Sequence, residues 1–454
     1  MTATARPWPS RTRRLLHFVL LVAVLLIPCT GKPYSLLTHQ QLIDLTWQHS
    51  IRPLLLSRYP KLTESDLLVA HAYAYGGCAI QDLGYYPFGN SFFSDLTHYV
   101  RTGDFVIALF RNSTNANELA FSIGALSHYL SDNIGHSESI NTAVAIEFPK
   151  LAKKYGPEVT FEDGPHAHIR TEFAFDINEI AKNRFAPVLY VKHIGLRVPQ
   201  PLLEKAFFQT YGLNMRSALH YSRPVIKGYR FGVRSFIPRF AYAEALLHKN
   251  HFPPDTPGEP NDKLKADLAH AERDNHWGAY SRNPTFGTYV FAGIIFILPK
   301  VGVLSDLAIR GPRPETEVTY VDSFNRSIDA LRDSIAHFSN IPTSLANRDL
   351  DNGLRIRPGG YRLADNTYAK LLDILIQQQK KHPEQIIPTG LKENVLTYYA
   401  NPDAPITTKK DLPKWAKVQE ELVAFKTMKD TPNPPFVPGP DPDLPEPNDE
   451  PATK

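Results

Sequence analysis

Three side chains of metal-ligand type recur at four-residue steps within one mostly apolar stretch of the sequence. His128, Asp132 and His136 end the run 124–136, and a helix of about 3.6 residues per turn would align them along one face. Core-type residues surround them, and buried imidazoles and carboxylates need partners, of which a divalent cation is the commonest. The pattern predicts a metal site, and a polar stripe that faces solvent is the alternative.

A second pair repeats the same step further along the chain. His168 and Glu172 could share one face of a helix turn and hold half of another metal site, although a lone pair of this kind also arises by chance. His166 is expected in a loop and competes with His168 for the role.

Two more candidates lie between residues 76 and 99. Asp82 stands in an aromatic, glycine-rich loop and could equally be a turn former, while His98 could be a satisfied core histidine. His39, near the start of the first expected helix, is ambiguous in the same way. Aromatic residues after Asp82 either line the mouth of a site or pack in the core: Tyr85, Tyr86, Phe88, Phe92 and Phe93.

Helical patterning must position these residues, because strand alternation is hard to find in the sequence. Apolar residues recur with a helical period in seven segments, and glycine and proline mark the joints between them. We therefore predict an all-α fold. The expected helices cover residues 38–57, 65–75, 91–101, 118–135, 167–182, 201–209 and 367–380.

The first 31 residues have the build of a secretory signal peptide. Three arginines precede an apolar run over residues 15–27, which is too short to span a bilayer comfortably. We expect cleavage after Gly31 and a secreted or periplasmic protein whose mature chain has no transmembrane helix. A lipid-modified Cys29 is the alternative, which Pro28 disfavours.

Removal of this signal would leave a formally neutral chain. The signal holds four of the 50 lysines and arginines and none of the 46 acids, so 46 residues of each sign would remain. Nucleic-acid binding usually demands a clustered basic excess, so we expect no nucleic-acid partner. Cys78 would be the only cysteine left, so stability must come from burial or from metal, not from an internal disulfide.

We divide the chain into a signal peptide (1–31), a catalytic domain (32–250), a helical C-terminal region (251–429) and a disordered tail (430–454). The tail contains nine prolines and six acids and too few apolar side chains to offset the entropy of ordering. An apolar run at 286–298 is expected to be a core helix, and a face that docks on lipid is the alternative.

The candidate residues, taken in order, resemble the zinc-dependent phospholipase C superfamily, which also includes three-zinc single-strand nucleases. The chain looks closest to the catalytic domain of glycosylphosphatidylinositol-specific phospholipase D and to bacterial phospholipase C-like proteins. The resemblance covers residues 35 to about 180, and the stretches 347–349 and 358–365 look broadly similar to bacterial phospholipase-like tails. It is carried by Ser35-Leu36-Leu37-Thr38-His39, Asp82 before Tyr85-Tyr86-Pro87, Leu96-Thr97-His98-Tyr99-Val100-Arg101, the run from His128 to His136, and His168 to Glu172.

The resemblance implies two or three zinc ions. The chain departs from the family pattern in two ways. Three residues, not the five of bacterial phospholipases C and the nucleases, separate Asp132 from His136, as in the phospholipase D relative, and Trp47 comes too late to act as the N-terminal tryptophan that many members use on the third ion. By position, the implied ligands are Asp82, His98, His128 and Asp132 for one ion, His136, His168 and Glu172 for a second, and His39 with a bridging Asp132 for a third.

Zinc suits phosphodiester hydrolysis because it lowers the pKa of a bound water and shields the phosphate. The expected reaction is attack of metal-bound hydroxide on the phosphorus of a phospholipid at a membrane surface, with Asp82 and Asp132 as the catalytic residues. No G-x-S-x-G or G-x-x-x-x-G-K-[ST] motif offers another mechanism. A single-strand nuclease of the same superfamily and a non-catalytic, metal-stabilised scaffold are the alternatives.

Overall fold

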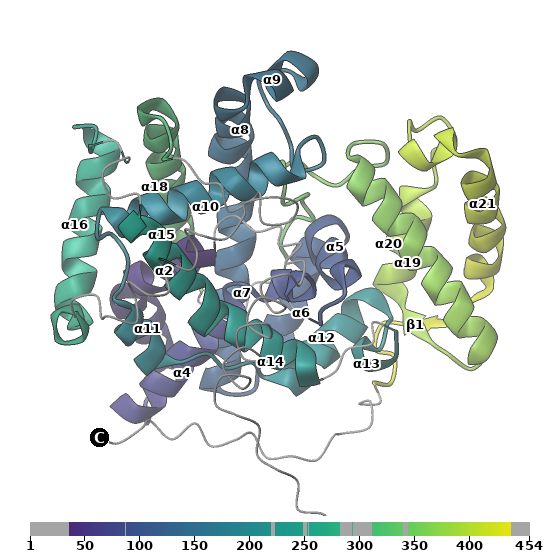
Figure 1. Ribbon diagram of the computed structural model, residues 1–454. Coiled ribbons are helices and arrows are strands. Elements are labelled where there is room, and N and C mark those ends of the chain that lie inside the picture. The colour runs from purple at the N-terminus through teal and green to yellow at the C-terminus, as the bar shows by residue number, and fades with distance from the viewer. Residues whose placement is uncertain are drawn as a thin grey trace, which may run out of the picture.

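The computed structural model describes residues 36–86, 88–218, 223–247, 252, 254–281, 293, 311–338 and 344–436. Within them the fold is helical, as predicted, apart from one parallel pair of two-residue strands, β1 and β2 (Figure 1). The predicted signal peptide, nearly all of the 286–298 run and the tail after residue 436 lie outside the described residues. The elements are α2 (Leu36–Thr46), η1 (Trp47–Ile51), α3 (Arg52–Arg58), α4 (Glu64–Gly77), η2 (Ile80–Tyr85), α5 (Ser91–Tyr99), α6 (Thr102–Asn112), α7 (Ala116–Gly135), η3 (His136–Ile140), α8 (Asn141–Glu147), α9 (Pro149–Tyr155), α10 (Pro165–Ala181), α11 (Val188–Ile194), α12 (Gln200–Tyr211), α13 (Met215–Ala218), α14 (Arg223–Phe231), η4 (Gly232–Phe236), α15 (Ile237–Leu247), α16 (Glu259–Asp274), η5 (Trp277–Tyr280), α18 (Pro314–Ala336), α19 (Arg362–Lys381), β1 (Ile387–Pro388), α20 (Thr389–Tyr398), η7 (Thr407–Lys410), α21 (Leu412–Thr427) and β2 (Asp430–Thr431).

All seven predicted helices are present, and the differences lie at their ends or in their regularity. The segment predicted as one helix over 38–57 contains a π-helical turn, η1, between α2 and α3. Pro53, which has no N–H to donate, follows this turn, as is common where a helix departs from regular α geometry. Helix α19 begins at Arg362, five residues before its predicted start.

Helix α7 lies at the centre of the fold and is buried along most of its length, packed against α4, α6 and α18 (Figure 1). Its first turn is closed by side chains: Asn115 accepts a hydrogen bond from the N–H of Glu118 at 3.0 Å, and the Glu118 carboxylate accepts one from the N–H of Thr114 at 2.7 Å. The last turns of this well-anchored helix carry His128 and Asp132.

Helices α4 and α7 cross at very close range because a glycine from each lies at the crossing. A Cβ atom on Gly124 would lie 2.2 Å from the carbonyl oxygen of Ala74, and one on Gly77 would lie 2.0 Å from that of Phe121. No side chain fits at either position. The crossing therefore fixes η2, which follows α4 and carries Asp82, next to the turn of α7 that begins after Gly124.

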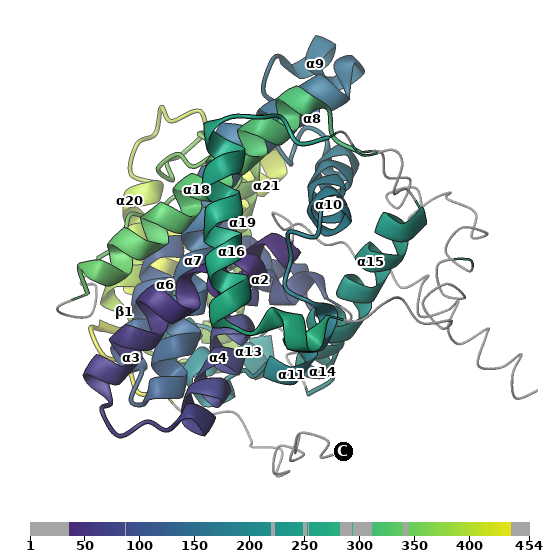
Figure 2. The ribbon, with the colours of Figure 1, turned by 90° about the vertical axis from the view of Figure 1, so that its left-hand side faces the viewer.

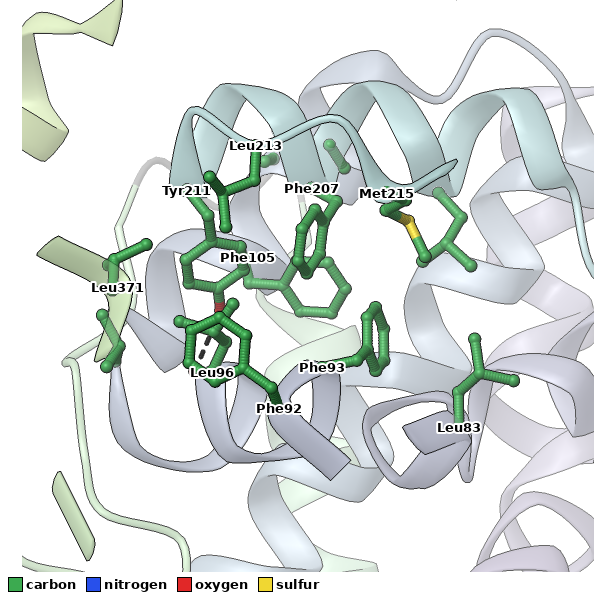
Figure 3. Packing of buried hydrophobic residues seen from close by; sticks show 14 of the residues in the cluster. Leu83, Phe92, Phe93, Leu96, Phe105, Phe207, Tyr211, Leu213, Met215 and Leu371 are labelled. Atoms are coloured by element: carbon green, nitrogen blue, oxygen red, sulfur yellow. Dashed lines mark hydrogen bonds between the residues drawn. The ribbon is translucent and has the colours of Figure 1, made fainter. Parts of the chain in front are cut away.

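Two large apolar clusters hold the helices together, and each joins segments far apart in sequence. In the first, the rings of Phe93 and Phe207 stack at 5.2 Å, and the Tyr211 hydroxyl donates to the carbonyl of Leu96 at 3.1 Å (Figure 3). Leu371 of α19 belongs to the same cluster. The C-terminal helices thus share a core with α5 and α12.

The second cluster joins α18 to α2 and α7, and α16 packs against α18 and α2 (Figure 2). The division at residue 250 remains a prediction, but helices from both sides of it pack together. Helices α19, α20 and α21 form a group at the right of Figure 1. No helix in the described part of the chain is both long enough and apolar enough to cross a membrane.

The first residues of the tail predicted as disordered are placed against this group. Asp430 and Thr431 form β2, which pairs with β1, and the ring of Phe436 lies 5.5 Å from that of Phe208. Backbone pairing and one aromatic contact thus accompany the first residues of a segment that composition alone describes as too polar to order, and the disorder of the tail stays a prediction.

The close packing of α4 against α7 at Gly124 can be tested by substitution. Gly124→Ala should lower the free energy of unfolding by about 1–3 kcal/mol or more, because the added methyl forces α4 away from α7. Urea denaturation of the variant and of a Gly278→Ala control measures this change, since a Cβ at Gly278 meets no atom within 4 Å. Equal losses in the two variants would contradict the interpretation.

Candidate metal centre

All eight residues predicted as ligands are buried, each 2 % exposed or less, and they gather in the same interior region. In each of three groups, the possible ligand atoms lie within 4.8 Å of one another. Two groups share His128 and so form one larger cluster. The groups are His39, His128 and Asp132; Asp82, His98 and His128; and His136, His168 and Glu172.

Asp132 lies at the centre of the first two groups and directs its two carboxylate oxygens to different imidazoles. Its Oδ1 lies 3.4 Å from Nε2 of His39, and its Oδ2 lies 3.1 Å from Nε2 of His128 and 3.5 Å from that of His98. A carboxylate arranged in this way could act as a ligand together with His39 and also together with His98 and His128.

Asp82 faces the same imidazoles from η2. Its Oδ1 lies 3.4 Å from Nε2 of His98, and its Oδ2 lies 3.8 Å from Nδ1 of His128. Because α5, α7 and η2 each contribute to this group, its geometry depends on the packing of three elements. The third group is more local: α10 supplies His168 and Glu172, whose Nδ1 and Oε1 atoms are 3.5 Å apart.

The imidazoles are oriented by hydrogen bonds through the ring nitrogen that does not face the cluster. Metal-ligating histidines almost always engage the second nitrogen in this way, which fixes both the ring and its tautomer. The pairs are His39 Nδ1 with Ser131 Oγ at 2.9 Å, His98 Nδ1 with the Ser94 carbonyl at 2.8 Å, His128 Nδ1 with the Cys78 carbonyl at 3.1 Å, and His168 Nε2 with the Val159 carbonyl at 2.5 Å.

Several atoms that face the cluster have no hydrogen-bond partner among the described residues. Folded proteins rarely bury many such polar atoms together unless an ion or ligand satisfies them. Imidazole nitrogens and carboxylate oxygens are the ligands that zinc commonly takes, so the residues present fit this ion. The atoms are both carboxylate oxygens of Asp82 and Asp132, Nε2 of His98 and His128, Nδ1 of His168, and Oε1 of Glu172.

Charge interactions in the ion-free protein differ between the two sides of the cluster. Burial alone would lower the pKa of His98, but Asp132 and Asp82 outweigh it and raise this pKa to about 10. His128 is affected in the same direction, since burial lowers its pKa and the two carboxylates raise it further than burial lowers it. Without a bound cation, protonation of these imidazoles thus offsets the negative charge of the two aspartates.

The group of His136, His168 and Glu172 has no such compensation. Burial lowers the pKa of His136, and burial together with His136 lowers the pKa of His168 to about 3. Burial also raises the pKa of Glu172 well above its ordinary value. Both imidazoles are therefore neutral, which is the form that binds a metal, and a bound cation would favour the ionised Glu172.

The structure also shows where His166 and the aromatic residues after Asp82 lie. His166 lies in α10, not in a loop as predicted, because Pro165 occupies the first helical position, where its missing N–H costs nothing. Its side chain is exposed, whereas His168 is buried in the cluster. Of the five aromatic residues after Asp82, Tyr85, Tyr86, Phe92 and Phe93 are buried and only Phe88 is exposed.

Several residues that support this region were missed at the sequence level. Asp176, one helix turn after Glu172, accepts hydrogen bonds from the N–H groups of Leu37 and Thr38, each at 3.2 Å, and so anchors the turn of α2 that carries His39. Two further acids, Asp349 and Asp351, come from the segment after α18 and are discussed below. Only the four-residue step from Glu172 could have pointed to Asp176.

Comparison with known proteins supports the same interpretation of this region. Residues 38–221 match the family model described as zinc dependent phospholipase C, and this range contains all eight clustered residues. The comparisons with curated proteins and with solved structures gave no match. The match supports the assignment of residues 38–221 to the zinc-dependent phospholipase C superfamily.

Proposed function

We propose that this protein is a zinc-dependent phosphodiester hydrolase that acts on phospholipids in the manner of a phospholipase C. One observation carries the proposal: eight buried imidazoles and carboxylates converge within the region that matches the family. Two or three zinc ions would be held there, one by Asp82, His98, His128 and Asp132, one by His136, His168 and Glu172, and a third between His39 and Asp132.

Bound zinc would supply charge stabilisation for the phosphate and an acidified water. Asp82 would accept a proton from the attacking water while the new bond to phosphorus forms. The phosphorus–oxygen bond to the leaving alcohol then breaks, and that oxygen takes up a proton. His98 and His128, held by the backbone carbonyls of Ser94 and Cys78, would keep their Nε2 atoms in place throughout.

Phospholipid is the substrate class that the charge of the protein favours. A chain whose basic and acidic residues balance after loss of the predicted signal offers no general attraction for a nucleic acid. The exposed Phe88, six residues after Asp82, provides an apolar side chain near this part of the fold that a membrane surface could accept. We further propose export to the periplasm or the medium, which rests on the predicted signal peptide.

A substrate panel tests the proposed reaction. The zinc-loaded full chain is incubated with vesicles of phosphatidylcholine, phosphatidylethanolamine or phosphatidylinositol, and separately with single-stranded DNA, and both products are identified. Diacylglycerol and a phosphorylated headgroup are expected, with activity lost on chelation and restored by zinc. Nucleotides without diacylglycerol would instead identify a nuclease. No turnover at full zinc occupancy would favour the non-catalytic scaffold.

Substitution of the clustered residues tests the site. His128→Ala and Asp132→Asn should each lower kcat/KM by at least roughly 100-fold, because loss of a cation forfeits several kcal/mol of charge stabilisation. Zinc content, measured by atomic emission, should fall in parallel. The matched control is His166→Ala, an exposed histidine on the same helix as His168, which should retain both zinc and activity. Full turnover by a metal-free His128→Ala protein would refute the assignment.

Proton release on zinc binding tests the electrostatics of the first group. His98, with its pKa raised to about 10, carries a proton at pH 7 in the ion-free protein, and zinc must displace it. The apparent zinc affinity should therefore rise from pH 6 to pH 8. Calorimetry in buffers of different ionisation enthalpy should count about one proton fewer for His98→Gln than for the unchanged protein. Identical counts would show that His98 is neutral before zinc binds.

A further inference from the structure

A second pair of buried acids lies beside the metal centre but outside the region that matches the family. Asp349 and Asp351 are each 2 % exposed and belong to the segment between α18 and α19. A tight turn holds them: the N–H of Asp349 donates to the Leu354 carbonyl at 2.8 Å, and the N–H of Asp351 donates to the Asp349 carboxylate at 3.1 Å. The pair is thus part of a defined local structure.

This turn is fixed against the elements that carry the candidate ligands. The N–H of Leu350 donates to the carbonyl of His98 at 3.1 Å, and the side chain of Asn141 donates to the carbonyl of Asp351 at 2.9 Å. Gly353 has a φ of 70°, and a Cβ added there would lie 2.8 Å from the carbonyl oxygen of Asn133. Asp351 is therefore placed between the end of α5 and the end of α7.

Two tyrosines hold the carboxylate of Asp351 in one orientation. The hydroxyls of Tyr99 and Tyr361 both donate to its Oδ2 atom, each at 2.8 Å. Among the described residues, no lysine, arginine or histidine forms an ion pair with this carboxylate. The nearby Arg348 donates to the Gly353 carbonyl. A buried carboxylate without a cationic partner is costly, so a positive charge is expected close to it.

The contacts of this turn place Asp351 against the element that begins with His136. Residues on both sides of His136 touch the turn: the Asn141 side chain donates to the Asp351 carbonyl, and a Cβ added at Gly353 would lie 2.8 Å from the Asn133 carbonyl oxygen and 3.1 Å from Oγ of Ser137. Asp351 is not itself a member of the third group, His136, His168 and Glu172, whose possible ligand atoms lie within 4.8 Å of one another. Independently, Nδ1 of His168 and Oε1 of Glu172 are buried there without hydrogen-bond partners.

A charge count shows what this group lacks. Two neutral imidazoles and one carboxylate offset only one of the two charges of a divalent ion, whereas the cluster around Asp132 has two carboxylates. We propose that Asp351 is a positioning residue that supplies the second negative charge for a zinc ion held by His136, His168 and Glu172. This inference rests on the zinc site of the proposed function and adds to it a residue from beyond position 221.

Zinc affinity tests this inference without any substrate. The metal-free full chain is titrated with zinc against a chromogenic chelator. Asp351→Asn should raise the dissociation constant of the weakened site roughly 10- to 100-fold, the range found for groups that act on a metal through its ligands. Asp351→Glu, which keeps the charge, should restore most of the affinity. An unchanged dissociation constant in Asp351→Asn would overturn the inference, and so would equal losses in the Asn and Glu variants.

Two controls separate a local charge effect from a disturbed fold. Asp365→Asn alters another buried carboxylate of the same region, which accepts a hydrogen bond from the N–H of Gly359 at 2.9 Å, and it should leave zinc affinity unchanged. In a His168→Ala background, where the third group is already incomplete, Asp351→Asn should have no further effect. An undiminished effect in that background would place the action of Asp351 elsewhere and overturn the inference.

The result of the zinc titration does not depend on whether the protein hydrolyses phospholipid. If the unchanged protein hydrolyses no phospholipid but Asp351→Asn weakens zinc binding as expected, the proposed function fails and the inference stands. If phospholipid is hydrolysed and zinc affinity does not depend on Asp351, the inference fails and the proposed function stands.

Discussion

Asp132, fully buried, faces three imidazoles at distances from 3.1 to 3.5 Å, and the rest of the fold must accommodate this concentration of ionisable groups. Desolvation alone would favour neutral forms of all of them. On the Asp132 side a proton on His98 compensates the two aspartates, but on the Glu172 side no group of the cluster is positive. A divalent cation on each side would resolve both situations at once, and folding and metal binding would then be coupled.

This constraint explains why the supporting structure is rigid where the ligand residues attach. The close crossing at Gly77 and Gly124 holds two helices at backbone contact, and Asp176 anchors the first turn of α2. Backbone carbonyls fix the rings of His98 and His128. The rings of His98 and His128 are thus oriented by neighbouring backbone groups through the nitrogen that the cluster leaves free, as a preorganised metal site requires.

The helices could be predicted from the sequence because they follow from local spacing, and the same spacing selected the candidate ligand residues. The steps from His128 to Asp132 and from His168 to Glu172 lie within single helices, where a period of about 3.6 residues suffices. That these helices meet could be inferred only from the resemblance. Asp351 could not be predicted, since its partner Tyr99 is 252 residues away and no period relates the two.

The error at His166 has a different origin, because Gly164-Pro165 was interpreted as a loop although proline also favours the first position of a helix.

The region that matches the family ends at residue 221, yet the structure around the cluster does not end there. Thr38, the neighbour of His39, shares a hydrogen bond of 2.6 Å with the hydroxyl of Tyr320 in α18, and Leu371 of α19 completes the core around α5. Helix α18 also packs along α7. Because the helices that carry the candidate ligands are buried partly by segments from the second half of the chain, the candidate metal centre depends on that half for its exclusion of water as well as for its position.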